Sequence, residues 1–221
     1  MVRAGLAVAA LLAAAPALAE DDVQAWSAAT ATVTVSDRVV VWLEGQARTS
    51  NDVSRLNQVL LRPGVGYRVS PTTTLFVGYA HVFTNPPGPA RTNEHRVWQQ
   101  ATFRIAGDGK GVTLSGRSRL EQRSLVQGED TGVRFRQLLR LTAPVGDQGV
   151  QAVGWSELFL GLNRTDWGQP TGFDRARNFA GLSVPLSRTL RAEPGYMYEP
   201  IRQRGADRHN HIASVTLNLT L

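Results

Sequence analysis

Arginine occupies every second position in several stretches of this chain, and this alternation restricts the possible folds more than any other feature of the sequence. In residues 132–144 the arginines share one parity and apolar side chains take the other: Arg134, Arg136 and Arg140 against Val133, Phe135, Leu139 and Leu141. Because successive side chains of a β-strand point to opposite faces of the sheet, this segment is predicted to be a strand with one charged and one apolar face. Repeated in segments of about a dozen residues, the pattern favours a transmembrane β-barrel with an apolar exterior and a polar lumen.

The N-terminus has the pattern of a secretory signal peptide. Arg3 supplies a positive charge, residues 5–15 an apolar core, and Ala17-Leu18-Ala19 a small-residue cleavage site. We therefore predict that residues 1–19 are a cleaved signal peptide and that residues 20–221 form a single barrel domain in the outer membrane of a Gram-negative bacterium. This mature segment has no run of about 18 apolar residues, so we predict no transmembrane helix. The chain has no cysteine, which excludes disulfide and thiolate chemistry.

The chain is basic, with 24 Lys and Arg residues against 18 Asp and Glu residues. A basic balance often indicates nucleic acid or an anionic surface as a partner. Here Lys110 is the one lysine, and the arginines are spread through the predicted strands instead of forming a cluster. We therefore expect no nucleic-acid partner.

Turn residues divide the mature chain into eleven predicted strands. They cover residues 23–35, 38–49, 56–69, 73–84, 93–106, 111–124, 132–144, 150–163, 174–186, 188–200 and 207–221. Short turns and longer loops alternate between them, as in outer-membrane barrels, but an odd strand number is unusual for a single-chain bacterial barrel. We predict an all-β fold: an antiparallel up-and-down transmembrane β-barrel of about 10–12 strands.

Apolar side chains of one parity are predicted to form the outer face. The clearest runs are Val59, Leu61, Val65, Tyr67 and Val69; Val97, Phe103 and Ile105; and Val215, Leu217, Leu219 and Leu221. By the same parity, Trp26, Trp42, Trp98 and Trp155 are predicted to face the lumen, and Tyr79, Tyr196 and Tyr198 the outside.

Five stretches resemble a known bacterial family. They are LRPGVGY (61–67), EHRVWQQ (94–100), RSRLEQR (117–123), FDRARN (173–178) and GYMYE (195–199). In this order, and over nearly the whole mature chain, they resemble the family named domain of unknown function 2490. The resemblance implies an outer-membrane barrel and implies neither an activity nor catalytic residues.

Charged side chains of the inward parity are predicted to form a lumenal network. Its members are Glu94, Arg96, Arg117, Arg119, Glu121, Arg123, Arg134, Arg136, Arg140, Glu157, Arg175, Arg177 and Glu199. A hairpin centred on Asp108-Gly109 would place Arg96 opposite Glu121, Glu94 opposite Arg123 and Trp98 opposite Arg119. The same construction at the next turns pairs Arg136 with Glu157 and Arg175 with Glu199. Facing opposite charges stabilise a sheet by about 0.2–1 kcal/mol each.

Two readings of this network stay open. A barrel of this size is only slightly wider than one that side chains can fill, so the network can close the lumen. Because arginine outnumbers acid on the inward face, it can also line a narrow pore that prefers anions.

The outer rim offers a second set of candidates, near the predicted long loops: His81, His95, Trp167, His209 and His211. A lipid hydrolase could draw on His81, Ser214 and Glu94, but no nucleophile motif such as Gly-x-Ser-x-Gly accompanies them. Two histidines on one strand face supply half of a tetrahedral metal site. A polar girdle that meets lipopolysaccharide phosphates and sugars is the simpler interpretation.

We therefore predict a small outer-membrane barrel with an Arg/Glu-lined lumen that is structural or a narrow pore. We expect no catalytic residues, metal or cofactor. Its expected partners are outer-membrane lipid, lipopolysaccharide and, during insertion, the barrel-assembly machinery. The alternatives are an outer-rim hydrolase acting on lipid or lipopolysaccharide, and a soluble periplasmic lipocalin-like barrel, which would have apolar residues inside and charges outside.

Overall fold

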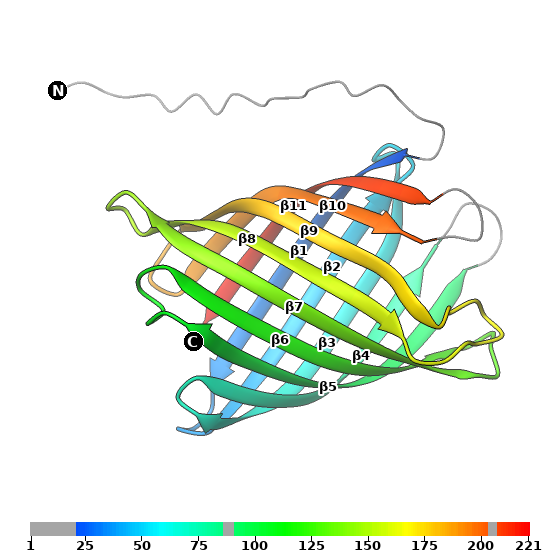
Figure 1. Cartoon of the computed structure of the whole chain (residues 1–221), viewed down its shortest axis with the longest axis horizontal. Coiled ribbons are helices and arrows are strands. Elements are labelled where there is room, and N and C mark those ends of the chain that lie inside the picture. The colour runs from blue at the N-terminus through cyan, green and yellow to red at the C-terminus, as the bar shows by residue number, and fades with distance from the viewer. Residues whose placement is uncertain (1–20, 86–90, 203–206) are drawn as a thin grey trace.

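The computed structural model describes residues 21–85, 91–202 and 207–221, so the predicted signal peptide lies outside the described residues. These residues form eleven strands of one closed β-barrel (Figure 1). The strands are β1 (Asp21–Thr34), β2 (Val39–Ser50), β3 (Arg55–Ser70), β4 (Thr73–Thr84), β5 (Thr92–Ala106), β6 (Thr113–Leu125), β7 (Thr131–Val145), β8 (Val150–Gly161), β9 (Gly172–Pro185), β10 (Leu190–Ile201) and β11 (Arg208–Thr220). No helix long and apolar enough to span a membrane occurs in the described part of the chain.

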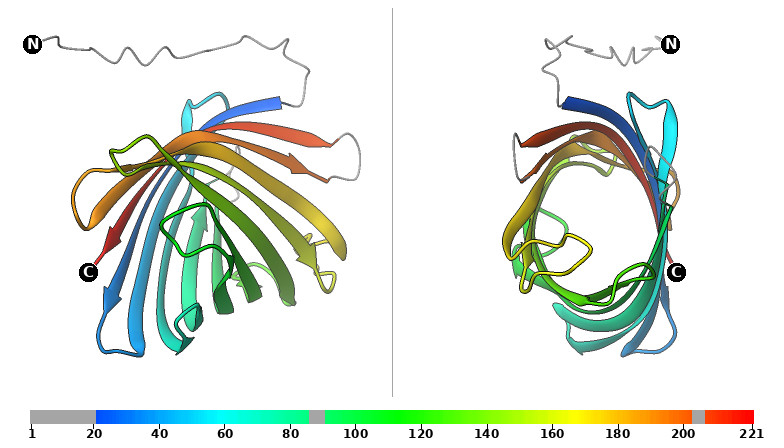
Figure 2. Two further views of the ribbon diagram at one scale, coloured as in Figure 1. Left: turned by 60° about the vertical axis from the view of Figure 1, so that its left-hand side comes forward. Right: turned by 90° about the vertical axis from the view of Figure 1, so that its right-hand side faces the viewer.

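Each strand pairs with its neighbours in sequence, and β1 closes the barrel against β11. All sequential pairs are antiparallel, whereas β1 and β11 run parallel, from Asp21 opposite His209 to Thr32 opposite Thr220. An odd number of strands requires this, because the first and last strands of an up-and-down barrel then point the same way. The prediction of an all-β barrel of ten to twelve strands is confirmed, and the parallel seam corrects its description as antiparallel throughout (Figure 2).

The two faces of the sheet have the polarity that the alternation predicts. Aliphatic side chains of the outer face are exposed, for example Leu61 at 54% and Val77 at 56%. Of the residues predicted to face outward, Phe103, Tyr198 and Leu219 are partly covered and the others are exposed. Charged side chains fill the interior instead, with Glu121 at 0% and Arg119 at 1% exposure.

Polar side chains on the outer face occur in hydrogen-bonded pairs. The pairs are Gln99–Gln122, Ser118–Gln137 and Ser156–Asn178, each joining neighbouring strands. Each pair satisfies part of its own hydrogen-bonding capacity without water, which lowers the cost of placing it on an apolar surface.

The predicted cross-strand register is wrong by two residues. Arg96 lies opposite Arg123, and Trp98 lies opposite Glu121. The turn between β5 and β6 is wider than predicted, because the Asp108 carboxylate accepts hydrogen bonds from the amides of Lys110 and Gly111, each at 2.9 Å. Ala106 lies opposite Leu114 next to the turn, and a register shift between Arg104 and Ala106 then reduces the displacement to two residues.

The other predicted facing pairs show the same displacement. Leu138 rather than Arg136 lies opposite Glu157, and Ile201 rather than Glu199 lies opposite Arg175. Because side chains alternate with period two, a shift of two residues leaves every side chain on its predicted face. The lumenal face is therefore unaffected by the error.

Two glycines leave space for the side chain of Trp98, which is fully buried. One belongs to the LRPGVGY segment and the other to the next strand. The Trp98 indole lies over Gly64 of β3 and Gly78 of β4, where an added Cβ would come within 2.6 Å and 2.3 Å of its ring. Any larger residue at these positions would displace the indole from the lumen.

Candidate functional site

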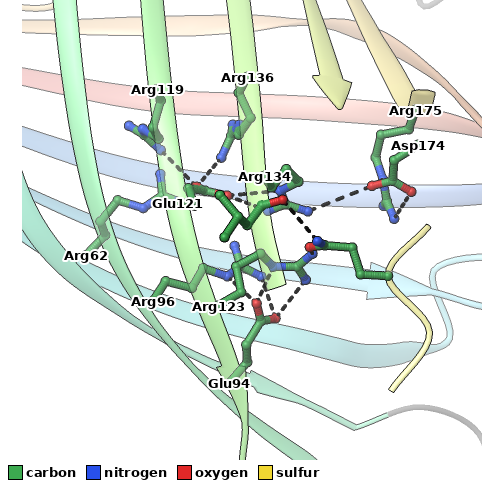
Figure 3. A network of polar contacts seen from close by, with 12 residues as sticks. Arg62, Glu94, Arg96, Arg119, Glu121, Arg123, Arg134, Arg136, Asp174 and Arg175 are labelled. Carbon is green, nitrogen blue, oxygen red and sulfur yellow. Dashed lines mark hydrogen bonds and ion pairs between the residues drawn. The ribbon is translucent and has the colours of Figure 1, made fainter. Parts of the chain in front are cut away.

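A layer of paired charges crosses the middle of the lumen (Figure 3). At its centre the Glu121 carboxylate accepts hydrogen bonds from Arg134 at 2.6 Å and from Arg136 at 2.8 Å. Arg136 also donates to Glu157 at 2.9 Å, and Arg117 donates to Glu157 at 2.8 Å. These groups come from three neighbouring strands. The odd-numbered residues of β6 and β8 and the even-numbered residues of β7 face the lumen.

Further ion pairs extend the layer around the barrel. Glu94 binds Arg96 and Arg123, Glu44 binds Arg62, Glu199 binds Arg177, Asp174 binds Arg175, and Glu193 binds Arg140. The structure thus brings every member of the predicted network into the lumen. Arg136–Glu157 and Glu94–Arg123 form as diagonal contacts despite the shifted register.

Arg119 is held differently from the other arginines of the layer. Its guanidinium lies between two indoles, 5.6 Å from the Trp42 ring and 4.9 Å from the Trp98 ring, in cation–π contact. Its Nε donates to Gln100 at 2.7 Å, and its Nη1 lies 3.7 Å from Glu121. Within the described residues its two Nη atoms have no hydrogen-bond partner.

This layer lies between two cavities of the lumen. We call it the septum: Glu44, Arg62, Trp98, Arg119, Glu121, Arg134, Arg136, Glu157 and Phe159. The turn-side chamber, of about 440 Å³, extends toward the short turns, and the loop-side chamber, of about 350 Å³, toward the long loops. Arg48, Arg62, Arg136 and Arg177 line both chambers, as expected for side chains between them.

The loop between β8 and β9 covers the loop-side chamber. Trp167 packs its ring 5.0 Å from the Arg123 guanidinium and donates its indole N–H to the carbonyl of Asp130 at 2.8 Å. Gln169, which is buried, accepts a hydrogen bond from Arg123 at 3.0 Å and donates to the carbonyl of Val133 at 3.0 Å. The loop therefore folds over the barrel mouth, and Trp167 is partly covered.

Further hydrogen bonds, which we call the loop latch, join this loop to the loop between β6 and β7. The Asp166 carboxylate accepts hydrogen bonds from the amides of Glu129 at 2.9 Å and Asp130 at 3.1 Å. These amide contacts, that of Glu129 first, hold the pKa of the Asp166 carboxyl below its ordinary value.

The four histidines lie on the outer face, in two clusters with tyrosines. His81 stacks on His95 with ring centroids 5.1 Å apart, and the Tyr79 hydroxyl bonds to His95 Nδ1. On β10 and β11, hydroxyls of two tyrosines bond to Nδ1 atoms of two histidines: Tyr196 to His211 at 2.6 Å and Tyr198 to His209 at 2.7 Å. The Nε2 of His211 also lies 3.9 Å from a carboxylate oxygen of Asp21.

The parts of the predicted hydrolase do not form one constellation. Glu94 lies inside the barrel with Arg96 and Arg123, Ser214 lines the turn-side chamber, and His81 is exposed on the outer face. Among the described residues, no group of three His, Cys, Asp or Glu side chains is placed to hold a metal ion.

Several lumenal residues lie outside the predicted network. Parity alone identifies Glu44, Arg62 and Glu193 as inward-facing. Asp174 has outward parity and reaches the lumen because the β8–β9 pairing shifts register between Phe159 and Leu160. No pattern in the sequence marks that shift.

Comparisons with known proteins identify relatives without assigning an activity. A family model described as "Protein of unknown function (DUF2490)" matches residues 23–210. An uncharacterized protein of Methylorubrum extorquens is 40% identical over 199 residues, covering 89% of this chain and 86% of the relative. No solved structure matches the chain.

Proposed function

Because this chain belongs to the DUF2490 family of proteins of unknown function, we propose its function from its own geometry: an outer-membrane β-barrel whose lumen is kept closed by the septum. One observation carries the proposal. The barrel has charged residues inside and aliphatic residues outside, the reverse of a water-soluble barrel.

The outer face supports a lipid environment. Exposed valines and leucines occur on strands around the barrel, among them Val41, Val65, Leu139, Leu182 and Leu217. Such a continuous apolar band is expected on the lipid-facing side of an outer-membrane barrel. In water it would form an apolar patch much larger than those of monomeric soluble proteins. The predicted export signal, outside the described residues, agrees with this location.

The septum supports a closed lumen. Trp98, Arg119, Glu121 and Phe159 are all at most 1% exposed. Phe159 packs against Arg136 and Arg177, with guanidinium carbons 4.4 and 4.7 Å from its ring. Glu121 and Glu157 each bind at least two arginines, which holds the charged part of the septum in place.

The chambers on either side of the septum favour anions. The turn-side chamber is lined by six arginines and three acids: Arg48, Arg62, Arg117, Arg136, Arg140 and Arg177 against Glu44, Glu157 and Glu193. An opened septum would therefore give a pore that prefers anions.

Single-channel recording of the refolded mature chain in a planar bilayer, under a salt gradient, tests the proposal. The wild-type protein is expected to insert and to show no discrete conductance steps. The Trp98→Ala variant, which removes an indole from the septum, is expected to show steps with anion preference. Trp155→Ala, which truncates an indole in the chamber wall outside the septum, serves as the matched control and should stay silent.

The outcomes separate the two parts of the proposal. Steps in the wild-type recording would refute the closed septum. A chain that stays in solution and does not enter lipid vesicles, measured by co-flotation, would refute the membrane location.

A further inference from the structure

The turn-side chamber has an apolar side and a cationic side. β1 and β8–β10 contribute Trp26, Trp155, Phe179 and Met197, and the rings of Trp155 and Phe179 stack 5.2 Å apart. These side chains pack with the buried Val153 and Ile212 in one apolar cluster. β2, β3, β6 and β7 contribute arginines to the rest of the lining, and β9 adds Arg177, whose guanidinium carbon lies 4.8 Å from the Trp26 ring.

Arg48 stands where the two sides meet. Its guanidinium carbon lies 4.0 Å from the centre of the Trp26 ring, and its hydrogen bonds go to the amide oxygens of Gln46 and Gln58. Within the described residues it has no carboxylate partner in an ion pair, whereas Arg62, Arg117, Arg136, Arg140 and Arg177 each have at least one. The positive charge of Arg48 is therefore not neutralised by a pair.

A second arginine of the lining has unused hydrogen-bonding capacity. Arg62 is only 3% exposed, and its Nε has no hydrogen-bond partner among the described residues. A buried donor without a partner carries a desolvation cost, which an acceptor on a bound molecule would relieve.

The chamber has the size and access of a ligand site. Its volume of about 440 Å³ falls in the range of about 300–1,000 Å³ typical of small-molecule pockets. Thr72, in an exposed turn, is part of its lining, so the chamber meets solvent at the short-turn end. At its other end the chamber borders the septum, together with Arg48 and Arg177, which line both chambers.

We infer that the turn-side chamber binds a small organic acid, with its carboxylate at Arg48 and its apolar body against Trp155, Phe179 and Met197. Arginine is suited to this contact because its planar guanidinium forms two parallel hydrogen bonds to a carboxylate. The inference rests on the proposed function only in that a closed septum gives the chamber a floor.

Three probes with one ring and different head groups test the inference: 4-fluorophenylacetate, 4-fluorobenzyl alcohol and 4-fluorobenzylammonium. Each is titrated with the detergent-refolded mature chain, and ¹⁹F NMR line broadening reports binding. Matched titrations into detergent alone correct for micelle partitioning. We expect the acid to bind, the alcohol to bind more weakly and the cation not to bind.

Substitutions locate the site. Arg48→Gln should weaken acid binding about tenfold, the loss expected for a charge-assisted hydrogen bond, with little effect on the alcohol. Trp155→Leu should weaken both. Arg38→Gln, the same charge change in an exposed turn, should change neither.

Two results would overturn the inference. One is a folded chain that binds acid and cation equally or not at all, and the other is Arg48→Gln with wild-type affinity for the acid. Either result in a barrel that inserts and stays silent would leave the proposed function intact. A barrel that conducts yet binds the acid would overturn the closed septum alone.

Discussion

The substitution Glu121→Gln tests most directly whether the charges of the septum are shielded from water. The Glu121 carboxylate is fully buried, and it accepts hydrogen bonds from Arg134 and Arg136, with Arg119 Nη1 at 3.7 Å. Glutamine preserves the volume but removes the negative charge. It also places an amide N–H₂ where one oxygen now accepts from a guanidinium, so that donor meets donor.

The expected loss of stability follows from the ion pairs that the three arginines keep when the Glu121 charge is removed. Arg136 keeps Glu157 at 2.9 Å, and Arg134 keeps Asp174 at 3.9 Å, but no other carboxylate among the described residues lies within ion-pair distance of Arg119. Removing one partner from a buried ionic group costs about 3–5 kcal/mol, because the remaining charges stay out of water. We expect Glu121→Gln to lower the free energy of unfolding by that amount.

Glu193→Gln is the matched control at the mouth of the turn-side chamber. Glu193 binds one arginine, Arg140, whose side chain is 29% exposed. Solvent therefore screens part of the interaction, and we expect a loss of about 1–2 kcal/mol, between the values for exposed and buried pairs.

Urea titration of the refolded variants in detergent micelles, followed by tryptophan fluorescence, measures both losses. The reasoning is wrong if Glu121→Gln costs no more than Glu193→Gln. That result would mean that water enters the septum and screens its charges, and it would weaken the argument for a closed lumen as well.

Three further predictions test packing, the outer face and the loop latch. Gly78→Ala should cost about 1–3 kcal/mol, because the added Cβ would lie 2.3 Å from the buried indole, while Gly45→Ala, with nothing within 4 Å, should be nearly neutral in the same urea titration. Val77→Arg should cost about 2–4 kcal/mol in lipid and Val69→Arg, near the short turns, about 0–1 kcal/mol; equal costs would contradict a lipid-facing band. The lowered pKa of Asp166 means that its latch stabilises the folded loops above the unfolded pKa of about 3.9 and is lost as pH falls through the folded pKa. The protection factors of amides in residues 126–131, that is, their exchange corrected for the intrinsic pH dependence, should therefore fall at low pH, and Asp166→Asn should remove that fall.

Local patterns in the sequence were sufficient for the strands and their faces. The period-two alternation of 132–144 predicts both the strand and the inward direction of its arginines, and the structure has the same arrangement in β7. Such predictions succeed because side-chain alternation depends only on the backbone of one strand. An error of two residues in pairing leaves them unchanged.

Turn geometry, irregular strand pairing and contacts between distant segments decided the rest. The wide turn held by Asp108 shifted the register, the irregular pairing at Phe159 and Leu160 brought Asp174 inside, and Trp167 folded over the mouth onto Arg123. The parallel seam of β1 and β11 joins the two ends of the described barrel.

The sequence by itself therefore determined that this chain is a β-barrel with charges on one face of its strands. Only the tertiary structure decided that those charges meet in a septum between two chambers, and that Arg48 forms no ion pair with a carboxylate of the described residues. The physical reason is that facing direction is a property of each strand, whereas which arginine reaches which acid depends on turn widths, register shifts and closure of the whole barrel.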